Sequence, residues 1–392
     1  MNKEEMHLKI MYYPKNKPYT THKDTTYVRT PADNILIVVV VFIVVFGLMA
    51  VFSASAPKAI GLGENPFSFT LKQIIWLIAG ILGAWFFSNF DYKRLKPFAG
   101  VLALIVLIAL LLVQFTPLGV TVNEAKRWLV LGPLQFQPSE MAKPALVLYF
   151  ATLFSKNCRI ADSDKYPFYI IFALMLLLIY KQPNLSMIVL LILTALAMYY
   201  AAGGSAKIIG GGFLAGIGLI ALTIRDYQLQ RIKIWWNPFV DALGSGYNII
   251  QSMVAFSSGG LFGVGFGNSK QKLSWLPEGH TDFIFAIIGE EFGFLGCFFL
   301  VCLFCVFLHR GFIIAKKCPD MFGKLLAIGI TFSICFQAFT NMSVASSFTP
   351  ATGIPLPFIS YGGSSLLVSL CMVGVLINIS KTKIQRIVHY VG

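Results

Sequence analysis

Long runs of apolar residues alternate with short polar stretches along almost the whole chain. About 20 apolar residues carry a helix across a bilayer, and amphipathic flanks can complete a shorter run. The pattern therefore predicts an all-α polytopic membrane protein with about ten transmembrane helices. The predicted spans cover about residues 35–52, 73–90, 98–115, 140–154, 168–180, 186–201, 207–224, 283–308, 325–341 and 364–379.

Proline and polar residues divide this pattern into its parts. Pro183 lies between two short apolar runs, which predicts a helical hairpin with a tight turn instead of one long helix. The longest polar stretch is a 58-residue extracytoplasmic loop, residues 225–282, between the seventh and eighth spans. Within it, Tyr247–Ser258 predicts a short helix on or in the membrane surface. The expected organisation is a flexible tail of residues 1–33, one ten-helix domain of residues 34–380 and a second tail of residues 381–392.

Composition agrees with this class and excludes others. Of all residues, 57% are hydrophobic and only 12% are charged, and the mean hydropathy is +0.74. A soluble domain carries about 25% charged residues, so a soluble enzyme, a disordered chain and a secreted disulfide scaffold are excluded. The seven Cys lie mostly in apolar runs. Cys302 and Cys305 have no second pair and no His beside them, which favours packing over a metal or redox role.

The placement of charge gives the orientation. The net charge is +14, from 31 Lys and Arg against 17 Asp and Glu. Twenty of the 31 basic residues fall in the two tails and in the loops on the same side as the tails. Short basic loops stay in the cytoplasm, so both termini are predicted to be cytoplasmic. The excess charge then indicates contact with anionic membrane lipid and no nucleic-acid partner.

Asp282 is the strongest candidate for chemistry. It ends the stretch 276–282 (LPEGHTD), which leads directly into an apolar helix, and Glu278 and His280 lie close to it in sequence. A carboxylate at the outer membrane edge is placed to act on a lipid-linked substrate whose polar head lies at that depth. The alternative is that Asp282 caps the following helix, a common use of Asp. The two roles are compatible.

Two further carboxylates lie deeper in the same predicted helix. Glu290 and Glu291 are about 12 Å along the helix from Asp282, at 1.5 Å per residue. Charged groups at such depth normally face partners inside a bundle. Lys143, three residues after Glu140 on another span, is the expected partner. Structural pairing is favoured over a proton or ion path.

Basic residues on the outer side form a second set of candidates. Lys126 and Arg127 precede Trp128, and Arg231 and Lys233 precede a Trp pair. Trp next to Lys or Arg is typical of a membrane anchor. The same cations could bind an anionic head such as pyrophosphate, which Arg can hold in a bidentate manner. The sequence leaves both roles open.

Two glycine- or proline-rich stretches complete the outer side. Residues 259–267 contain five Gly, but no strand precedes them and the Walker residues are absent, so they are not a nucleotide loop. Their amides, with Lys270 and Lys272, could still hold a phosphate. Residues 349–365 contain three Pro and cannot be a regular helix. Irregular backbone at membrane depth needs protein or water around it, so this stretch is predicted to line a groove.

Five stretches in order carry a family resemblance. They read AKRWL with FQPSEMAK, KQPNLSM, WNPFVDALGSGYNIIQS, GFGNSKQKLSWLPEGHTDFIFAIIGEEFG and TGIPLPFISYGGSS. Together they resemble the SEDS family (shape, elongation, division and sporulation) of membrane peptidoglycan polymerases, from about residue 33 to residue 388. The sequence GFGNSKQKL is similar to the FtsW branch, which acts at the septum, and differs from the RodA branch.

The resemblance implies an activity. Family members polymerise lipid II on the outer face of the cytoplasmic membrane and release undecaprenyl pyrophosphate. The family's essential Asp falls on Asp282, which would act as general base for the acceptor 4-hydroxyl. Lys126 and Arg127 would bind the pyrophosphate. No cofactor is required by the resemblance; a divalent cation (Mg or Mn) could assist, although no ligand cluster is visible. Further substrate contacts are expected at Glu140, Lys143, Gln182, Glu278, His280, Ser360, Tyr361, Gly362 and Gly363.

The resemblance also implies partners and a location. A cognate class B penicillin-binding protein, which is a transpeptidase, and other divisome membrane proteins are the expected partners, in the bacterial cytoplasmic membrane at the division septum. One departure from the family is Gln182-Pro-Asn184-Leu-Ser186 in place of Gln-Pro-Asp-Leu-Gly. It removes a carboxylate and puts any role of that Asp in doubt.

Two other functions compete with the polymerase. A lipid II flippase or other lipid transporter is favoured by the intramembrane Glu290 and Glu291 and by the broken segments. Alternating access, however, usually places its sites near the midplane, whereas the polar residues here gather on one side. A scaffold that only docks a transpeptidase is the third possibility, and it would leave Asp282 replaceable.

Overall fold

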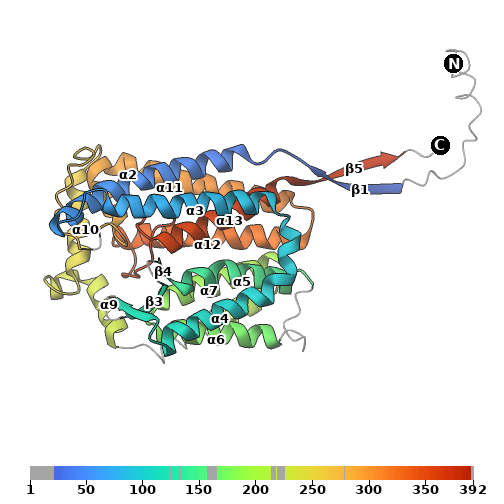
Figure 1. Cartoon of the computed structure of the whole chain (residues 1–392), viewed down its shortest axis with the longest axis horizontal. Coiled ribbons are helices and arrows are strands. Elements are labelled where there is room, and N and C mark those ends of the chain that lie inside the picture. Colours follow the sequence, from blue (N-terminus) through green and yellow to red (C-terminus); the bar gives the residue numbers. More distant parts are fainter. Residues whose placement is uncertain are drawn as a thin grey trace, which may run out of the picture.

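The structure, a computed structural model, describes residues 22–122, 125–131, 134–156, 166–212, 218, 226–277 and 279–389. Its helices run side by side along one axis (Figure 1). At one end lie the paired strands β1 (His22–Arg29) and β5 (Thr382–His389), and at the other lie α9 (Asp226–Trp236) and α10 (Tyr247–Gly259).

Among the described residues, six helices are long and apolar enough to cross a membrane. They are α2 (Asn34–Gly61), α3 (Ser68–Asn89), η1 with α4 (Tyr92–Phe98 and Ala99–Phe115), α11 (Ile284–Lys317), α12 (Met321–Ala345) and α13 (Gly363–Ser380). Three shorter helices also fall on predicted spans: α5 (Pro138–Phe154), α6 (Tyr166–Lys181) and α7 (Leu185–Ala201). The predicted span 207–224 lies mainly outside the described residues, which include helical residues up to 212. The prediction of a mainly helical protein with several membrane helices is confirmed.

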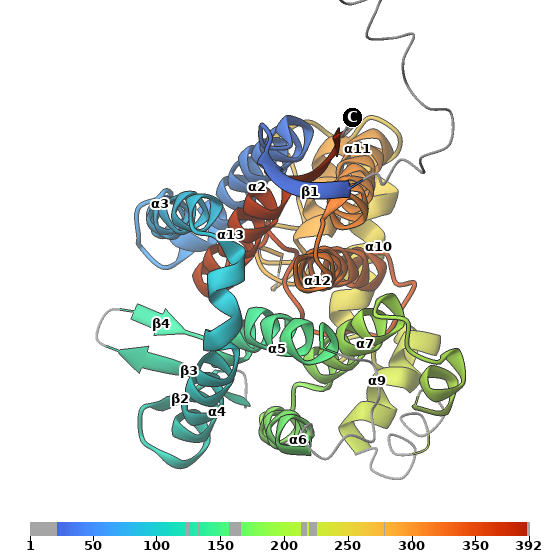
Figure 2. The same cartoon turned by 90° about the vertical axis from the view of Figure 1, so that its right-hand side faces the viewer.

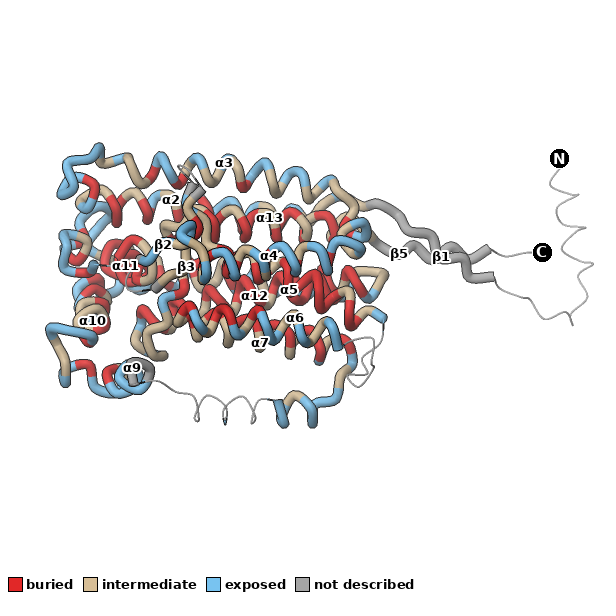
Figure 3. The backbone as a smooth tube through the Cα atoms, turned by 60° about the horizontal axis from the view of Figure 1, so that its bottom comes forward, coloured by how far each residue is buried: buried red, intermediate tan, exposed pale blue. Residues whose placement is uncertain are grey.

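Burial separates central helices from lipid-facing ones. In the most apolar stretch of α12, 72% of the residues are buried within the protein, against 17% for α3. Looking along the bundle axis, α12 lies among α5, α7 and α11, whereas α3 lies at the edge and packs mainly on α13 (Figure 2). Figure 3 shows buried residues concentrated in α5 and α12 and exposed ones along α3 and α4. The side chains exposed on α3 include Ile75 and Trp85. Because lipid is an apolar solvent, such a surface is stable in a bilayer.

Strands depart from the all-α expectation. Strands β2 (Gly119–Val122), β3 (Ala125–Leu131) and β4 (Leu134–Phe136) form an antiparallel sheet between α4 and α5. Strand β1, in the tail that was predicted to be flexible, pairs over eight residues with β5, in the second predicted tail. Both sheets depend on pairing between separate segments, which hydropathy along the chain does not report.

The helical hairpin predicted at Pro183 is present. Helix α6 ends at Lys181 and α7 begins at Leu185. The main-chain amides of Gln182 and Asn184 both donate to Ile179 O, and the Asn184 side chain accepts from Met187 N at 3.3 Å as the cap of α7. Asn184 therefore caps a helix, a role that Asn fills well.

The described residues of the segment 225–282 pack on the bundle. The short helix predicted at Tyr247–Ser258 is confirmed by α10, which packs against α11. A Cβ on Gly259 would lie 2.0 Å from Gly289 O, so glycine is needed where the two helices meet. Trp235 Nε1 donates to Ser347 O at 3.0 Å, which ties α9 to the segment after α12.

Candidate active site at the start of α11

Asp282 lies directly before the first turn of α11. Phe283 is the N-cap residue of that helix, so Asp282 is not its cap. The Asp282 side chain is partly exposed. Three consecutive main-chain oxygens each accept one hydrogen bond: His280 O from Tyr361 N at 3.0 Å, Thr281 O from Ser360 Oγ at 2.6 Å, and Asp282 O from Asn341 Nδ2 at 2.8 Å. The main chain that carries the carboxylate is therefore fixed on one side.

The proline-rich segment between α12 and α13 faces Asp282. It is irregular over residues 346–362, whereas residues 363–365 of the predicted irregular stretch 349–365 belong to α13. Gly353 has a φ of +68°, and a Cβ there would lie 3.5 Å from Asp282 Oδ2. Only glycine adopts this backbone conformation without strain. The next residue, Ile354, offers its carbonyl oxygen to Asn341 Nδ2 at 2.8 Å. Asn341 therefore bridges this segment and Asp282.

His280 and Tyr361 form an aromatic cluster beside the carboxylate. Both rings lie against Phe69, at centroid distances of 5.8 and 5.2 Å. His280 is 6% exposed, and its Nε2 lies 3.3 Å from Lys58 Nζ. Because an ammonium only donates, Nε2 is the acceptor in this contact. Burial, and after it the charge of Glu64, raises the pKa of the Tyr361 phenol, so its hydroxyl stays protonated at neutral pH.

Ser360, Gly362 and Gly363, the other residues of this predicted substrate contact, make contacts within the protein. Ser360 Oγ accepts from Leu356 N at 2.7 Å as well as donating to Thr281 O. Gly362 N donates to Gln73 Oε1 at 3.3 Å. A Cβ on Gly363 would lie 2.2 Å from the Trp76 ring, because α13 begins in close contact with α3.

Lys143 lies at the centre of a buried polar chain. Its Nζ is 2.7 Å from Glu140 Oε2 and donates to Gln337 Oε1 at 2.6 Å, and both ionic side chains are 1% exposed. Gln337 Nε2 in turn donates to Pro355 O at 2.8 Å. The prediction that Lys143 pairs with Glu290 or Glu291 is therefore wrong. Lys143 instead links α5, through α12, to the segment facing Asp282.

The basic pair on β3 contacts main-chain carbonyls. Lys126 Nζ donates to Thr116 O at 2.8 Å. Arg127 donates from Nε to Gln182 O at 2.8 Å and from Nη2 to Pro183 O at 2.6 Å. The side chain of Gln182 is 1% exposed, and neither its Oε1 nor its Nε2 has a hydrogen-bond partner in the structure. A buried amide without hydrogen-bond partners costs free energy. A polar ligand or a water molecule that binds this amide would recover that cost. Glu278 lies outside the described residues.

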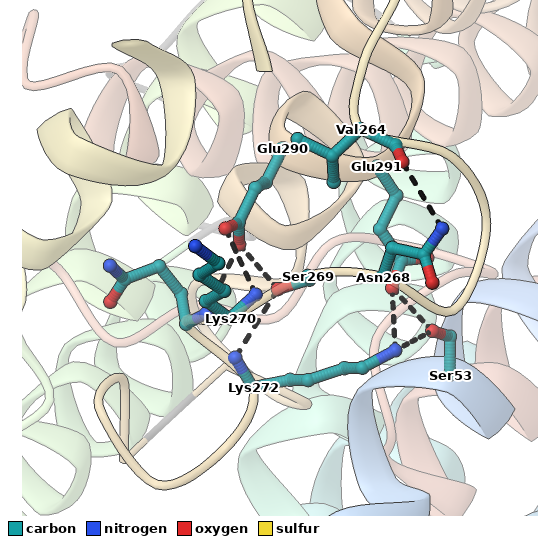
Figure 4. Close-up of polar contacts among 9 residues, drawn as sticks. Ser53, Val264, Asn268, Ser269, Lys270, Lys272, Glu290 and Glu291 are labelled. Carbon is teal, nitrogen blue, oxygen red and sulfur yellow. Dashed lines mark hydrogen bonds and ion pairs between the residues drawn. The ribbon is translucent and has the colours of Figure 1, made fainter. Parts of the chain in front are cut away.

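The carboxylates of Glu290 and Glu291 bind residues that directly follow the glycine-rich loop 259–267 (Figure 4). Glu290 accepts from the main-chain amides of Lys270 and Gln271 at 3.0 and 3.2 Å. Glu291 Oε1 is 2.8 Å from Lys272 Nζ. Structural pairing of these carboxylates is confirmed. The amides of Lys270 and Gln271 hold the Glu290 carboxylate. Within the stretch whose amides were predicted to hold a phosphate, Val264 N and Gly265 N donate to the main-chain oxygens of Glu290 and Glu291.

The sharp bend of α11 predicts that Gly293→Ala is strongly destabilising. Gly293 has a φ of +64°, and a Cβ there would lie 2.4 Å from Gly263 N and 2.6 Å from Leu261 O. A strained backbone of this kind costs about 1–3 kcal/mol for a residue with a side chain, and the clash adds to it. We expect a lower melting temperature in detergent for Gly293→Ala than for Gly100→Ala in α4, whose Cβ would meet nothing within 4 Å. Equal melting temperatures would contradict this account.

Several site residues were not anticipated from the sequence. Gln337 and Asn341 lie one turn apart on the buried face of α12, and Gln73 and Lys58 approach from α3 and α2. Two amides four residues apart in an apolar helix are a signal that could have identified the first pair. Within the part of the chain that the structure describes, no three His, Cys, Asp or Glu side chains gather as metal ligands.

Comparison with known proteins places the chain in a family. The profile of the FtsW/RodA/SpoVE family, described as "Cell cycle protein", matches residues 33–385. A probable peptidoglycan glycosyltransferase FtsW of Trichlorobacter lovleyi is 38% identical over 353 residues, which cover 89% of this chain and 93% of that protein. Stage V sporulation protein E of Bacillus subtilis is 37% identical, covering 90% and 98%.

Two solved structures share the fold. One chain comes from work on the structural coordination of polymerization and crosslinking by a peptidoglycan synthase complex; it has a TM-score of 0.74 and 28% identity over 89% of this chain and 97% of that one. The Thermus thermophilus Rod shape determining protein RodA has a TM-score of 0.66 and 28% identity, over 89% and 96%. With its apolar helices and with relatives aligned over nearly their whole length, this integral membrane protein belongs to the FtsW/RodA/SpoVE family of cell cycle proteins.

Proposed function

We propose that this protein is a peptidoglycan glycosyltransferase that polymerises lipid II, with Asp282 as its general base. The observation that carries the proposal is the fixing of residues 280–282 by three consecutive main-chain hydrogen bonds, with the Asp282 carboxylate facing Gly353. A general base must be held within hydrogen-bond reach of the proton it takes. Relatives named probable peptidoglycan glycosyltransferase FtsW support the same activity.

In the proposed reaction, Asp282 accepts the proton of the acceptor's 4-hydroxyl. The oxygen of that hydroxyl attacks the anomeric carbon of the donor, and a β-1,4 bond forms with inversion. The bond between this carbon and the pyrophosphate oxygen breaks, and its electron pair leaves with undecaprenyl pyrophosphate. One protein carboxylate is enough because pyrophosphate is already a good leaving group.

Further substrate contacts are proposed for the polar residues and glycines that the sequence singled out. The unpaired amide of Gln182 supports a polar ligand near Arg127, whose guanidinium already lies at the α6–α7 turn. Lys126 and Arg127 would meet the pyrophosphate. The other proposed contacts are Glu140, Lys143, Glu278, His280, Ser360, Tyr361, Gly362 and Gly363.

Location and partners follow from the family. We place the reaction on the outer face of the bacterial cytoplasmic membrane, with cytoplasmic termini and a role in septal synthesis. A similar chain comes from a peptidoglycan synthase complex that couples polymerization and crosslinking. This supports a cognate class B penicillin-binding protein as partner here, with other divisome membrane proteins around it.

A lipid II transporter is the second candidate. The observation in its favour was the pair of intramembrane carboxylates. Glu290 and Glu291 are, however, held by main-chain amides and by Lys272. Their depth is thus accounted for without a transport path, and the polymerase is the better-supported function.

The deciding experiment follows lipid II in two assays with the purified wild-type chain. In detergent, with and without the cognate transpeptidase, we expect long glycan strands and released undecaprenyl pyrophosphate. In vesicles, we expect no translocation of lipid II between leaflets. Translocation without any glycan, even with the transpeptidase present, would contradict the polymerase and establish the transporter.

A further inference from the structure

The outer part of α11 is a separate half-helix. Gly293, with a φ of +64° and a ψ of −164°, interrupts the helix after residues 284–292. This half-helix starts two residues after Asp282 and is buried almost throughout. The half-helix therefore continues directly from the main chain that carries the Asp282 carboxylate.

The glycine-rich loop supplies the hydrogen bonds that the interruption removes. Val264 N donates to the main-chain carbonyl oxygen of Glu290 at 2.9 Å, and Gly265 N donates to that of Glu291 at 3.0 Å. In the other direction, Phe294 N donates to Gly260 O at 2.9 Å. The loop is thus bonded to both sides of the bend.

The Glu290 side chain fixes the end of the same loop. Besides the amides of Lys270 and Gln271, it accepts from the hydroxyl of Ser269 (Figure 4). It also accepts from the hydroxyl of Ser258, in α10, at 3.4 Å. At 1% exposure, the carboxylate is almost completely desolvated. Burying a polar group is costly unless it is hydrogen-bonded. Both oxygens of the Glu290 carboxylate accept hydrogen bonds.

Glu291 ties the half-helix to α2. Its Oε1 accepts from Ser53 Oγ at 2.6 Å and from Lys272 Nζ at 2.8 Å, and Lys272 Nζ also donates to Ser53 Oγ at 2.8 Å. Lys58, further along α2, contacts His280. Helix α2 therefore holds the Asp282 segment at two points, one on each side of Asp282.

We propose that Glu291, Lys272 and Ser53 form a positioning clamp, and that Glu290 holds the loop that carries Lys272. The clamp sets the direction of the half-helix and thereby the position of the Asp282 carboxylate. The inference rests on the proposed function. A buried ion pair adds little stability compared with apolar residues of the same volume. It does define one geometry, and an error of about 1 Å in a reacting group costs about 100-fold in rate.

The test is a double-mutant cycle on the ion pair. Glu291→Gln, Lys272→Met and the double variant are compared with Lys270→Met, which removes the exposed lysine two residues away and keeps its amide. For each, kcat and KM for lipid II are measured together with hydrogen exchange of residues 284–292.

For a positioning role, each single variant should lower kcat about 10- to 100-fold with KM little changed. The double variant should be no worse than the worse single one, because both remove the same pair. Exchange in residues 284–292 should rise in these variants and stay at the wild-type rate in Lys270→Met. If Glu291→Gln does not fold, Ser53→Ala removes one bond of the clamp and should show the same pattern more weakly.

Two results would overturn the clamp. One is a wild-type kcat in folded Glu291→Gln or Ser53→Ala, whatever their melting temperatures. Such a result would mean that these contacts stabilise the fold without positioning Asp282. The other is unchanged exchange in the half-helix. If the wild type makes no glycan under any condition, the proposed function has failed, and the exchange measurement alone then decides whether the clamp holds the half-helix.

Discussion

Replacing Asp282 with Asn should abolish glycan polymerisation while the fold remains intact. The contact of residue 282 with Asn341 uses the main-chain oxygen, so it survives the change. Asn has the same shape as Asp and fits against Gly353, but its amide cannot accept the acceptor's proton. General-base catalysis contributes about 10²- to 10⁴-fold, and we expect a loss in this range in the initial rate of glycan formation from lipid II.

The matched control is Asp241→Asn. Asp241 is another carboxylate of the segment 225–282, and its Oδ2 accepts from Ser245 N at 2.8 Å. This variant should polymerise at the wild-type rate. The melting temperatures of both variants should match the wild type in detergent. A folded Asp282→Asn protein with undiminished rate would leave Asp282 without a role in the chemistry.

Replacing Lys143 with Met should unfold or severely weaken the protein. The change leaves the Glu140 carboxylate, 1% exposed, without the ammonium 2.7 Å away. Breaking a buried ion pair from one side costs about 3–5 kcal/mol. It also removes the donor to Gln337 Oε1 and so loosens the link to Pro355. The measurement is the melting temperature in detergent together with the rate of glycan formation.

The double variant Glu140→Gln with Lys143→Met separates the two effects. With no buried charge left, most of the lost stability should return, because removing both partners avoids the uncompensated ion. The rate should stay low, since Gln337 still lacks its donor. A single variant as stable as the wild type would contradict the burial of this pair. Full activity in the double variant would remove Lys143 from the support of the site.

Hydropathy predicted the helices well and their ends poorly. The first span was expected to end at residue 52, whereas α2 continues to Gly61. The added turns contain Ser53 and Lys58, whose side chains reach Glu291 and His280. Polar residues lower the hydropathy of a helix end, but they prolong the helix when other elements supply their partners. That information lies in the tertiary contacts.

The candidate site shows the same limit. The sequence singled out Asp282 as a candidate, and it predicted the irregular backbone between α12 and α13 and the pairing of the intramembrane carboxylates, because each depends on residue type and depth. It gave Glu291 the wrong partner: Lys143 lies on a predicted span, whereas the true partner, Lys272, lies in a loop. The contact between this loop and α11 depends on the bend at Gly293. In the sequence, the only sign of such a bend is one glycine.

The pairing of β1 with β5 has a consequence for the order of assembly. His22 lies opposite His389 and Arg29 lies opposite Thr382. During synthesis, the partner strand of β1 is made only after every membrane helix has been translated. Segments far apart in sequence pay the largest entropy of loop closure, so such pairs form late. Residues 22–29 therefore have no strand partner when they leave the ribosome. They can pair with β5 only after α13, which directly precedes β5, has been made and inserted.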